Sequence, residues 1–256
     1  MKINLKLATR LSLFVTPLVT GSVFVTLPSL AATLASSNAA VSYSNFSNNP
    51  LSIYTVTDAQ TSVLAPDGQV TANAEANAAF ITDPDLPVTQ AFNTSSSIVQ
   101  GNGNNYFGQA NSLAGIIGYD FVVGQGETFS FNFNALLDIN ASSDSLAEQA
   151  NSTGAISFQL LDTTDSNNTV VLDFFNLSGQ VNTADSSDFL DVEKSANFAY
   201  NPDNSSFNTS FGGLQESANV SVQGLFSRLF NSVTHLTLVE FKVNEAQASC
   251  SAPLPF

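Results

Sequence analysis

His235 is the single histidine of the chain, and it lies in a run with strand-like alternation, Val233 to Leu238. A Ser-His-Asp relay would have to use it, because the relay needs an imidazole to carry the proton. No Gly-x-Ser-x-Gly turn is present to hold a serine nucleophile. With one His and one Cys, the chain also lacks the usual ligands for zinc. We therefore interpret His235 as a structural or surface residue and predict that the chain is not an enzyme.

Carboxylates are the other groups that could do chemistry. Glycoside hydrolysis needs two of them across a cleft, and calcium needs oxygen ligands that loops can supply. Most acids lie in polar turns, which favours solvated loops, and neither dense cluster has EF-hand spacing. The sequence therefore assigns no catalytic or cofactor-binding residue and no position for a metal, although calcium stays open. The candidates are Asp83, Asp85, Asp138, Asp144, Glu148 and Glu193, with denser clusters at Asp162, Asp165, Asn167 and Asn168 and at Asp185, Asp188 and Asp191.

The N-terminus has the pattern of an export signal. Lys2, Lys6 and Arg10 precede an uncharged run, 11–30, and Ser29-Leu30-Ala31 offers small residues for cleavage. We predict a signal peptide over 1–31 and a secreted or cell-surface location. An uncleaved membrane anchor is the alternative, because about 20 apolar residues can span a bilayer.

Residues 32–256 carry three bases against 21 acids, and so a net charge of −18 with His neutral. Nucleic acids and anionic lipid surfaces bind through Lys and Arg, so both are unlikely partners for this chain. Cys250 is the single cysteine, which excludes an internal disulfide and leaves a free thiol or an intermolecular bridge.

Alternation with a period of two residues dominates the second half. Phe129, Phe131 and Phe133 alternate with polar residues up to Ile139, which predicts a strand with one buried face. The chain has 21 Phe and no Trp, so we expect Phe to form the core. Turn chemistry predicts hairpins at 124–126 and 162–168 and a loop at 101–105. Further strands are expected at 52–56, 119–123, 156–160, 170–177, 189–192, 198–200, 207–211, 218–223 and 236–243.

Short strands without a convincing helix indicate an all-β fold, an antiparallel β-sandwich that is jelly-roll-like. We expect its core over 119–245. The polar part 32–118 should contribute edge strands and loops, with 70–80 ambiguous between helix and strand. We expect a loop over 140–154 and a flexible tail over 246–256.

Four segments resemble cyanobacterial exported proteins of the PEP-CTERM type. They are Gly118 to Ile139, Thr153 to Thr163, Leu172 to Gly179 and Phe207 to Ser249. The resemblance implies a β-rich surface protein whose C-terminal Pro-Glu-Pro, apolar helix and basic cluster are read by an exosortase. This chain ends at Pro253-Leu254-Pro255-Phe256, without the Glu, the helix or the basic cluster. Truncation or simple release is therefore expected.

These features together predict a non-enzymatic component of the cell surface or extracellular matrix. Its expected partners are extracellular polysaccharide or further copies of the chain. A calcium-dependent, lectin-like carbohydrate-binding module is the alternative, and an extracellular glycosidase is a third hypothesis.

Overall fold

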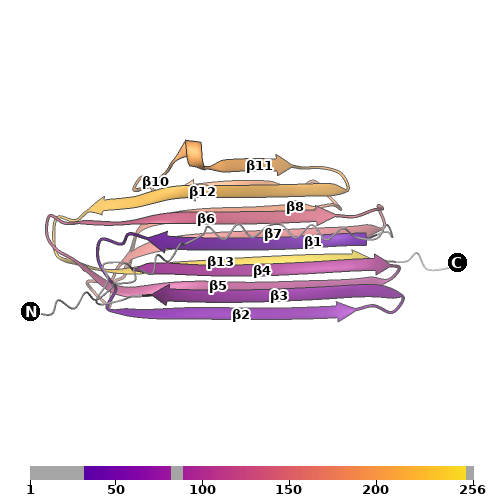
Figure 1. Cartoon of the computed structure of the whole chain (residues 1–256), viewed down its shortest axis with the longest axis horizontal. Helices are drawn as coiled ribbons and strands as arrows, with labels where there is room; N and C mark the ends of the chain where they lie inside the picture. Colours follow the sequence, from indigo (N-terminus) through magenta and orange to yellow (C-terminus); the bar gives the residue numbers. More distant parts are fainter. Residues whose placement is uncertain (1–31, 82–88, 252–256) are drawn as a thin grey trace, which may run out of the picture. The chain divides into compact units, whose positions relative to one another are not determined.

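A computed structural model describes residues 32–81 and 89–251. Two antiparallel sheets pack face to face, which confirms the all-β sandwich (Figure 1). The predicted signal peptide, 1–31, lies outside the described residues. Within the described ranges, no helix has the length and apolar character needed to cross a membrane.

Sheet A has the strand order β10-β12-β6-β1-β4-β3, with β11 paired to β12. Its strands are β1 (Ala32–Ser44), β3 (Gly68–Ile81), β4 (Gln90–Gly103), β6 (Thr128–Ser142), β10 (Phe198–Tyr200), β11 (Ser206–Ser210) and β12 (Gln215–Leu229). A short 3-10 helix, η1 (Pro202–Asn204), precedes β11.

Sheet B has the strand order β2-β5-β13-β7-β8-β9. Its strands are β2 (Ser52–Leu64), β5 (Tyr106–Val123), β7 (Glu148–Asp162), β8 (Val170–Asn182), β9 (Phe189–Lys194) and β13 (Thr234–Cys250).

Phenylalanine forms one part of the core, as predicted. The rings of Phe129, Phe131 and Phe133 project from β6 and are at most 1% exposed. Phe131 stacks on Phe226 of β12 with ring centroids 5.1 Å apart, and Phe133 meets Phe158 of β7 edge-on at 5.5 Å. Both geometries are favourable for aromatic pairs. The Phe residues therefore join the two sheets on the side of β6, β7, β8 and β12.

Small side chains form the rest of the core, between β1 and β4 of sheet A and β5 and β13 of sheet B. Buried residues here include Ala35, Ser37, Ser97, Ala110 and Ser112. Cα atoms of β13 lie within 8 Å of Cα atoms in β1 and β4, closer than the usual spacing of about 10 Å between packed sheets. Small side chains allow this approach, since larger ones would separate the layers.

Several boundaries differ from the sequence-based expectation. The 32–118 part does supply the edge strands β2 and β3, but β1, β4 and β5 lie inside the sheets, so the expectation of edges and loops is wrong for them. Many of their inward residues are Ala or Ser, which give only a weak apolar alternation. The ambiguous segment 70–80 is strand β3. In the predicted loop 140–154, only 143–147 connects β6 to β7.

The predicted hairpins have different outcomes. The turn at 162–168 joins the paired strands β7 and β8, as expected. The turn at 124–126 instead joins β5 of sheet B to β6 of sheet A, so that hairpin prediction is wrong. The flexible tail is also wrong for 246–250, because β13 continues to Cys250 and buries Ala246 and Ala248 between the sheets.

Candidate functional site

The outer face of sheet A carries rows of amide and hydroxyl side chains. One row crosses six strands through paired positions, and neighbouring strands are about 4.8 Å apart. Asp138 and Glu75 are the two charged residues among the described outer positions of this sheet. The row consists of Glu75, Ser96, Asn38, Asp138, Asn219 and Asn208.

Hydrogen bonds hold part of this polar surface in place. Ser96 Oγ donates to Asn38 Oδ1 at 2.7 Å, and Asn140 Nδ2 donates to Asp138 Oδ1 at 2.7 Å. Burial among these neighbours raises the pKa of Asp138, although the hydrogen bond from Asn140 opposes the shift. The structure thus presents a regular, largely uncharged array of donors and acceptors.

The outer face of sheet B is more apolar. On β13, Val239, Phe241 and Val243 point outward, whereas Glu240 and Lys242 point into the core. The Phe241 ring covers Gly115 of β5, where an added Cβ would lie 2.5 Å from Phe241 Cδ1. Glycine at position 115 therefore allows the ring to lie flat on the sheet.

A shallow hollow of about 520 Å³ lies at one end of this face, beside Tyr119, Thr163 and His235. His235 Nδ1 pairs with Asp120 Oδ1, and Asp120 has a left-handed backbone with φ 58°. Among the residues the structure describes, no hydroxyl makes a hydrogen bond with the His235 ring. The described part of the chain thus holds Asp120 and His235 as a pair, without a third residue hydrogen-bonded to the ring.

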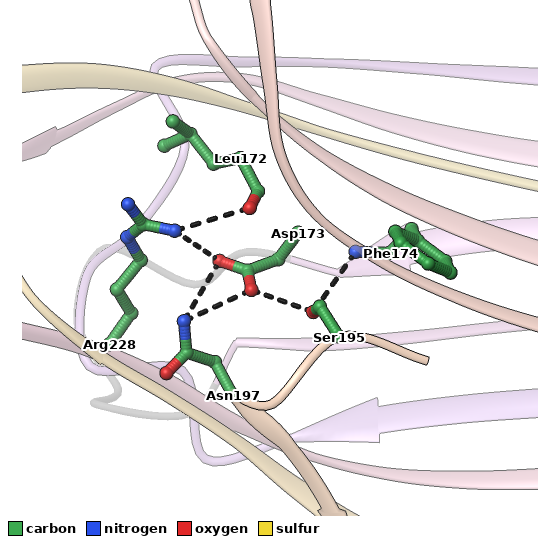
Figure 2. A network of polar contacts seen from close by, with 6 residues as sticks. All are labelled: Leu172, Asp173, Phe174, Ser195, Asn197 and Arg228. Carbon is green, nitrogen blue, oxygen red and sulfur yellow. Dashed lines mark hydrogen bonds and ion pairs between the residues drawn. The ribbon is translucent and has the colours of Figure 1, made fainter. Parts of the chain in front are cut away.

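A buried carboxylate links the two sheets at Asp173 of β8 (Figure 2). Arg228 Nη1 of β12 donates to Asp173 Oδ2 at 2.7 Å and to the Leu172 carbonyl at 3.2 Å. From the turn after β9, Ser195 Oγ donates to Asp173 Oδ1 at 2.6 Å and Asn197 Nδ2 donates at 3.0 Å. Asp173 is 2% exposed and fully surrounded by donors. This arrangement indicates a structural clamp, because protein groups occupy the oxygens that a ligand would need.

A second buried polar cluster lies between the small-residue strands. Lys242 Nζ donates to Glu240 Oε1 at 2.6 Å, and Asn93 Nδ2 donates to Glu240 Oε2. Burial lowers the pKa of Lys242 to about 8, although Glu240 opposes the shift. Burial likewise raises the pKa of Glu240, against the effect of Lys242. The two charges compensate each other inside the protein.

Asn244 continues this cluster along β13. Its Nδ2 donates to the Ser95 carbonyl at 2.8 Å, and its Oδ1 accepts from Ser37 Oγ at 3.0 Å. Gly154 of β7 leaves room for the contact, since a Cβ there would lie 2.8 Å from Ser37 Oγ. The cluster is thus a polar layer of the core, closed off from solvent.

The two acidic turns that were candidates for calcium use their acids for local hydrogen bonds. Asp162 Oδ1 accepts from the Thr164 amide at 2.9 Å, and Asp165 Oδ1 accepts from the Asn167 amide at 3.0 Å. Asp185 Oδ1 accepts from the Ser187 amide at 2.8 Å, and hydrogen bonds from Ser187 lower the pKa of Asp185. Within 32–81 and 89–251, no three His, Cys, Asp or Glu side chains gather as metal ligands would.

Asp188 does meet another acid, Glu216 of β12. Asp188 Oδ1 and Glu216 Oε2 both accept from the Asn182 amide at 2.9 Å. Burial, followed by the effect of Asp188, raises the pKa of Glu216 to about 6. Glu216 is 4% exposed, so the pair connects the ends of β8 and β12 without lining a cleft.

Comparison with known proteins leaves the site to be interpreted on its geometry. No protein-family model, no curated protein and no solved structure matches the chain.

Sequence reasoning missed the polar array on sheet A and the two buried ionic clusters. The array was visible as alternate Asn, Ser and Thr residues on Phe-rich strands, for instance Asn132 and Asn134 on β6. Its extent depends on which strands become neighbours, and strand order is a property of the fold. Asp173 and Arg228 lie 55 residues apart, and the local sequence gives no sign of their pairing.

Proposed function

We propose that the protein is an exported, non-enzymatic component of the cell surface or extracellular matrix. The outer face of sheet A binds neutral polysaccharide. Copies of the chain also associate with one another. The predicted signal peptide at 1–31 and the resemblance to exosortase-sorted proteins support the extracellular location. The net charge of −18 over residues 32–256 supports a partner without phosphate or other strong anionic groups.

The proposal that the protein binds polysaccharide rests on the amide and hydroxyl side chains on the outer face of sheet A. Each sugar hydroxyl both donates and accepts a hydrogen bond, and Asn and Ser side chains offer both functions. The row places Asn38, the acceptor Asp138 and Asn219 on successive strands, so a chain of sugars meets hydrogen-bonding partners along its length. Because the array is largely uncharged, binding should depend little on ionic strength.

Replacing two amides of the array tests the proposal. The double variant Asn134→Ala, Asn219→Ala removes side chains from β6 and β12 on the outer face of sheet A. Each lost hydrogen bond costs about 1 kcal/mol, so we expect affinity for exopolysaccharide from the producing cells to fall about tenfold or more. Retention on immobilised polysaccharide at several protein concentrations measures the change.

The matched control removes two amides from the outer face of sheet B, as Asn111→Ala with Gln159→Ala, and should bind like the unmodified chain. Failure of the unmodified chain to bind the polysaccharide would contradict the proposal for sheet A. Equal loss in both double variants would show that the assigned face is wrong.

A further inference from the structure

Strand β2 is an open edge of sheet B with almost no cover on either face. Of its 13 residues, only Val56 is partly buried. One side of β2 pairs with β5, and within the described residues its other side has no hydrogen-bonded neighbour. Figure 1 shows β2 at the margin of the sandwich, beyond β5 and β3. A long row of backbone donors and acceptors thus faces outward.

The composition of β2 offers little protection against pairing with another strand. Natural edge strands are commonly short, or carry Lys, Pro or a bulge that blocks pairing. β2 contains one charged residue, Asp58, and no Lys or Pro. The opposite edge strand β9 has six residues, among them Asp191, Glu193 and Lys194. Of the two edges of sheet B, β2 is therefore the one better suited to a partner strand.

We propose that β2 pairs with β2 of a second copy of this chain, in antiparallel register about a two-fold axis beside Ala59. This deepens the self-association part of the proposed function and uses a different surface from the polysaccharide face. Antiparallel pairing of two identical strands gives the closed symmetry of most homodimers. The two B sheets then form one continuous sheet.

Side-chain identities select this register. When the two-fold axis is normal to the sheet, the outer side chains of both strands stay on the outer face. Directly paired residues must then be an even number of positions apart in the sequence, so the axis passes beside a residue and not between two residues. Placed beside Asp58, it would bring two like charges together, which destabilises a cross-strand pair. Beside Ala59, Asp58 lies opposite the partner's Gln60. These side chains are compatible, because Gln60 Nε2 already donates to Asp58 Oδ2 within one chain at 2.9 Å.

The same register matches the exposed apolar residues at the two ends of β2. Tyr54 is 55% exposed and Leu64 is 64% exposed. In the dimer, Tyr54 lies opposite the partner's Leu64, and Thr55 lies opposite the partner's Val63. Each end of the paired strands thus buries an apolar pair that the single chain leaves in water.

Introducing a charge at position 59, beside the two-fold axis, tests the proposal with the full chain. Ala59→Lys places two ammonium groups opposite each other, and Ala59→Glu places two carboxylates there. We expect each variant alone to weaken dimerisation about tenfold or more, and an equimolar mixture of the two to recover the dimer. Sedimentation equilibrium over a range of concentrations measures the dissociation constants.

Two controls accompany this experiment. Thr209→Lys, on the exposed strand β11 of sheet A, should leave the dissociation constant unchanged. Raising NaCl from about 0.05 to 0.5 M should strengthen the unmodified dimer, because salt screens the repulsion between two acidic chains. Slowed hydrogen exchange of β2 amides at dimer-forming concentrations should accompany assembly.

A monomer at every concentration would overturn the proposal, as would a dimer unaffected by Ala59→Lys. A Lys and Glu mixture that fails to associate would overturn the symmetric register. The Ala59→Lys monomer should still be retained on polysaccharide, since the β2 edge and the outer face of sheet A are separate surfaces. Retention of the unmodified chain without its dimerisation would therefore contradict the β2 dimer alone and leave the polysaccharide proposal in place.

Discussion

At the scale of single residues, the buried pair of Glu240 and Lys242 is the least expected feature. A charge in the core is tolerated only when it is paired and hydrogen-bonded. Glu240 satisfies this condition through Lys242 and Asn93. Breaking such a pair from one side leaves the other charge buried without compensation, which is more costly than removing both.

We therefore predict that Lys242→Met lowers the free energy of unfolding by about 3 kcal/mol near pH 7. The double variant Lys242→Met, Glu240→Leu should recover most of the loss. Because burial raises the pKa of Glu240, its carboxyl in the single variant is stabilised when protonated. The deficit should then shrink as the pH is lowered towards 5. Urea unfolding at pH 5 and pH 8 measures both effects, and a deficit independent of pH would contradict this account.

At the scale of elements, the Asp173 cluster joins β8 and β12 to the turn between β9 and β10. Its donors come from Arg228 of β12 and from Ser195 and Asn197 of that turn. Hydrogen bonds to a charged group are worth about 2 kcal/mol each. The short strands β9 and β10, which this turn connects, therefore depend strongly on the Asp173 carboxylate.

Replacing the carboxylate should loosen those strands. We predict that Asp173→Ala lowers the free energy of unfolding by about 3 kcal/mol or more and speeds hydrogen exchange in β9 and β10. The double variant Asp173→Ala, Arg228→Met should lose less stability than the sum of the two single variants, since both changes remove the same ion pair. Asp191→Ala, at an exposed position of β9, serves as control. Additive losses in the double variant would show that the pair does not act as a unit.

The elements also show what the sequence could and could not predict. Phe129 to Ile139 was recognisable because every second residue is apolar and faces the core. In β13 the same rule fails, since Val239, Phe241 and Val243 face outward while Glu240, Lys242 and Asn244 are buried. Central strands can bear apolar residues on both faces, so alternation alone leaves the buried face undetermined. The polar partners that make the inversion possible, Asn93 and Ser95, come from β4 in the opposite sheet.

At the scale of the whole sandwich, the two outer faces differ in chemistry and the two core regions differ in the size of their side chains. Phe residues fill the region around β6 and β8, and Ala, Ser and Gly allow close approach around β1 and β13. The two sheets are also joined where β8 ends and β12 begins. Here Glu216 of sheet A and Asp188 beside sheet B both accept a hydrogen bond from the Asn182 amide. The neighbouring Asp188 carboxylate makes it less favourable for Glu216 to carry a second negative charge there.

The raised pKa of Glu216 predicts how stability depends on pH. Burial, followed by the effect of Asp188, raises the pKa of Glu216 from its ordinary value of 4.5 to about 6 in the folded protein. The folded state therefore binds more protons between these values, so the free energy of unfolding should fall as the pH rises from about 4.5 to 6. A shift of this size corresponds to a change of about 2 kcal/mol. Glu216→Gln should remove this component from urea unfolding curves measured across the window, whereas Glu193→Gln on β9 should retain it. A wild-type slope that survives Glu216→Gln would assign the pH dependence to general repulsion among the acids instead.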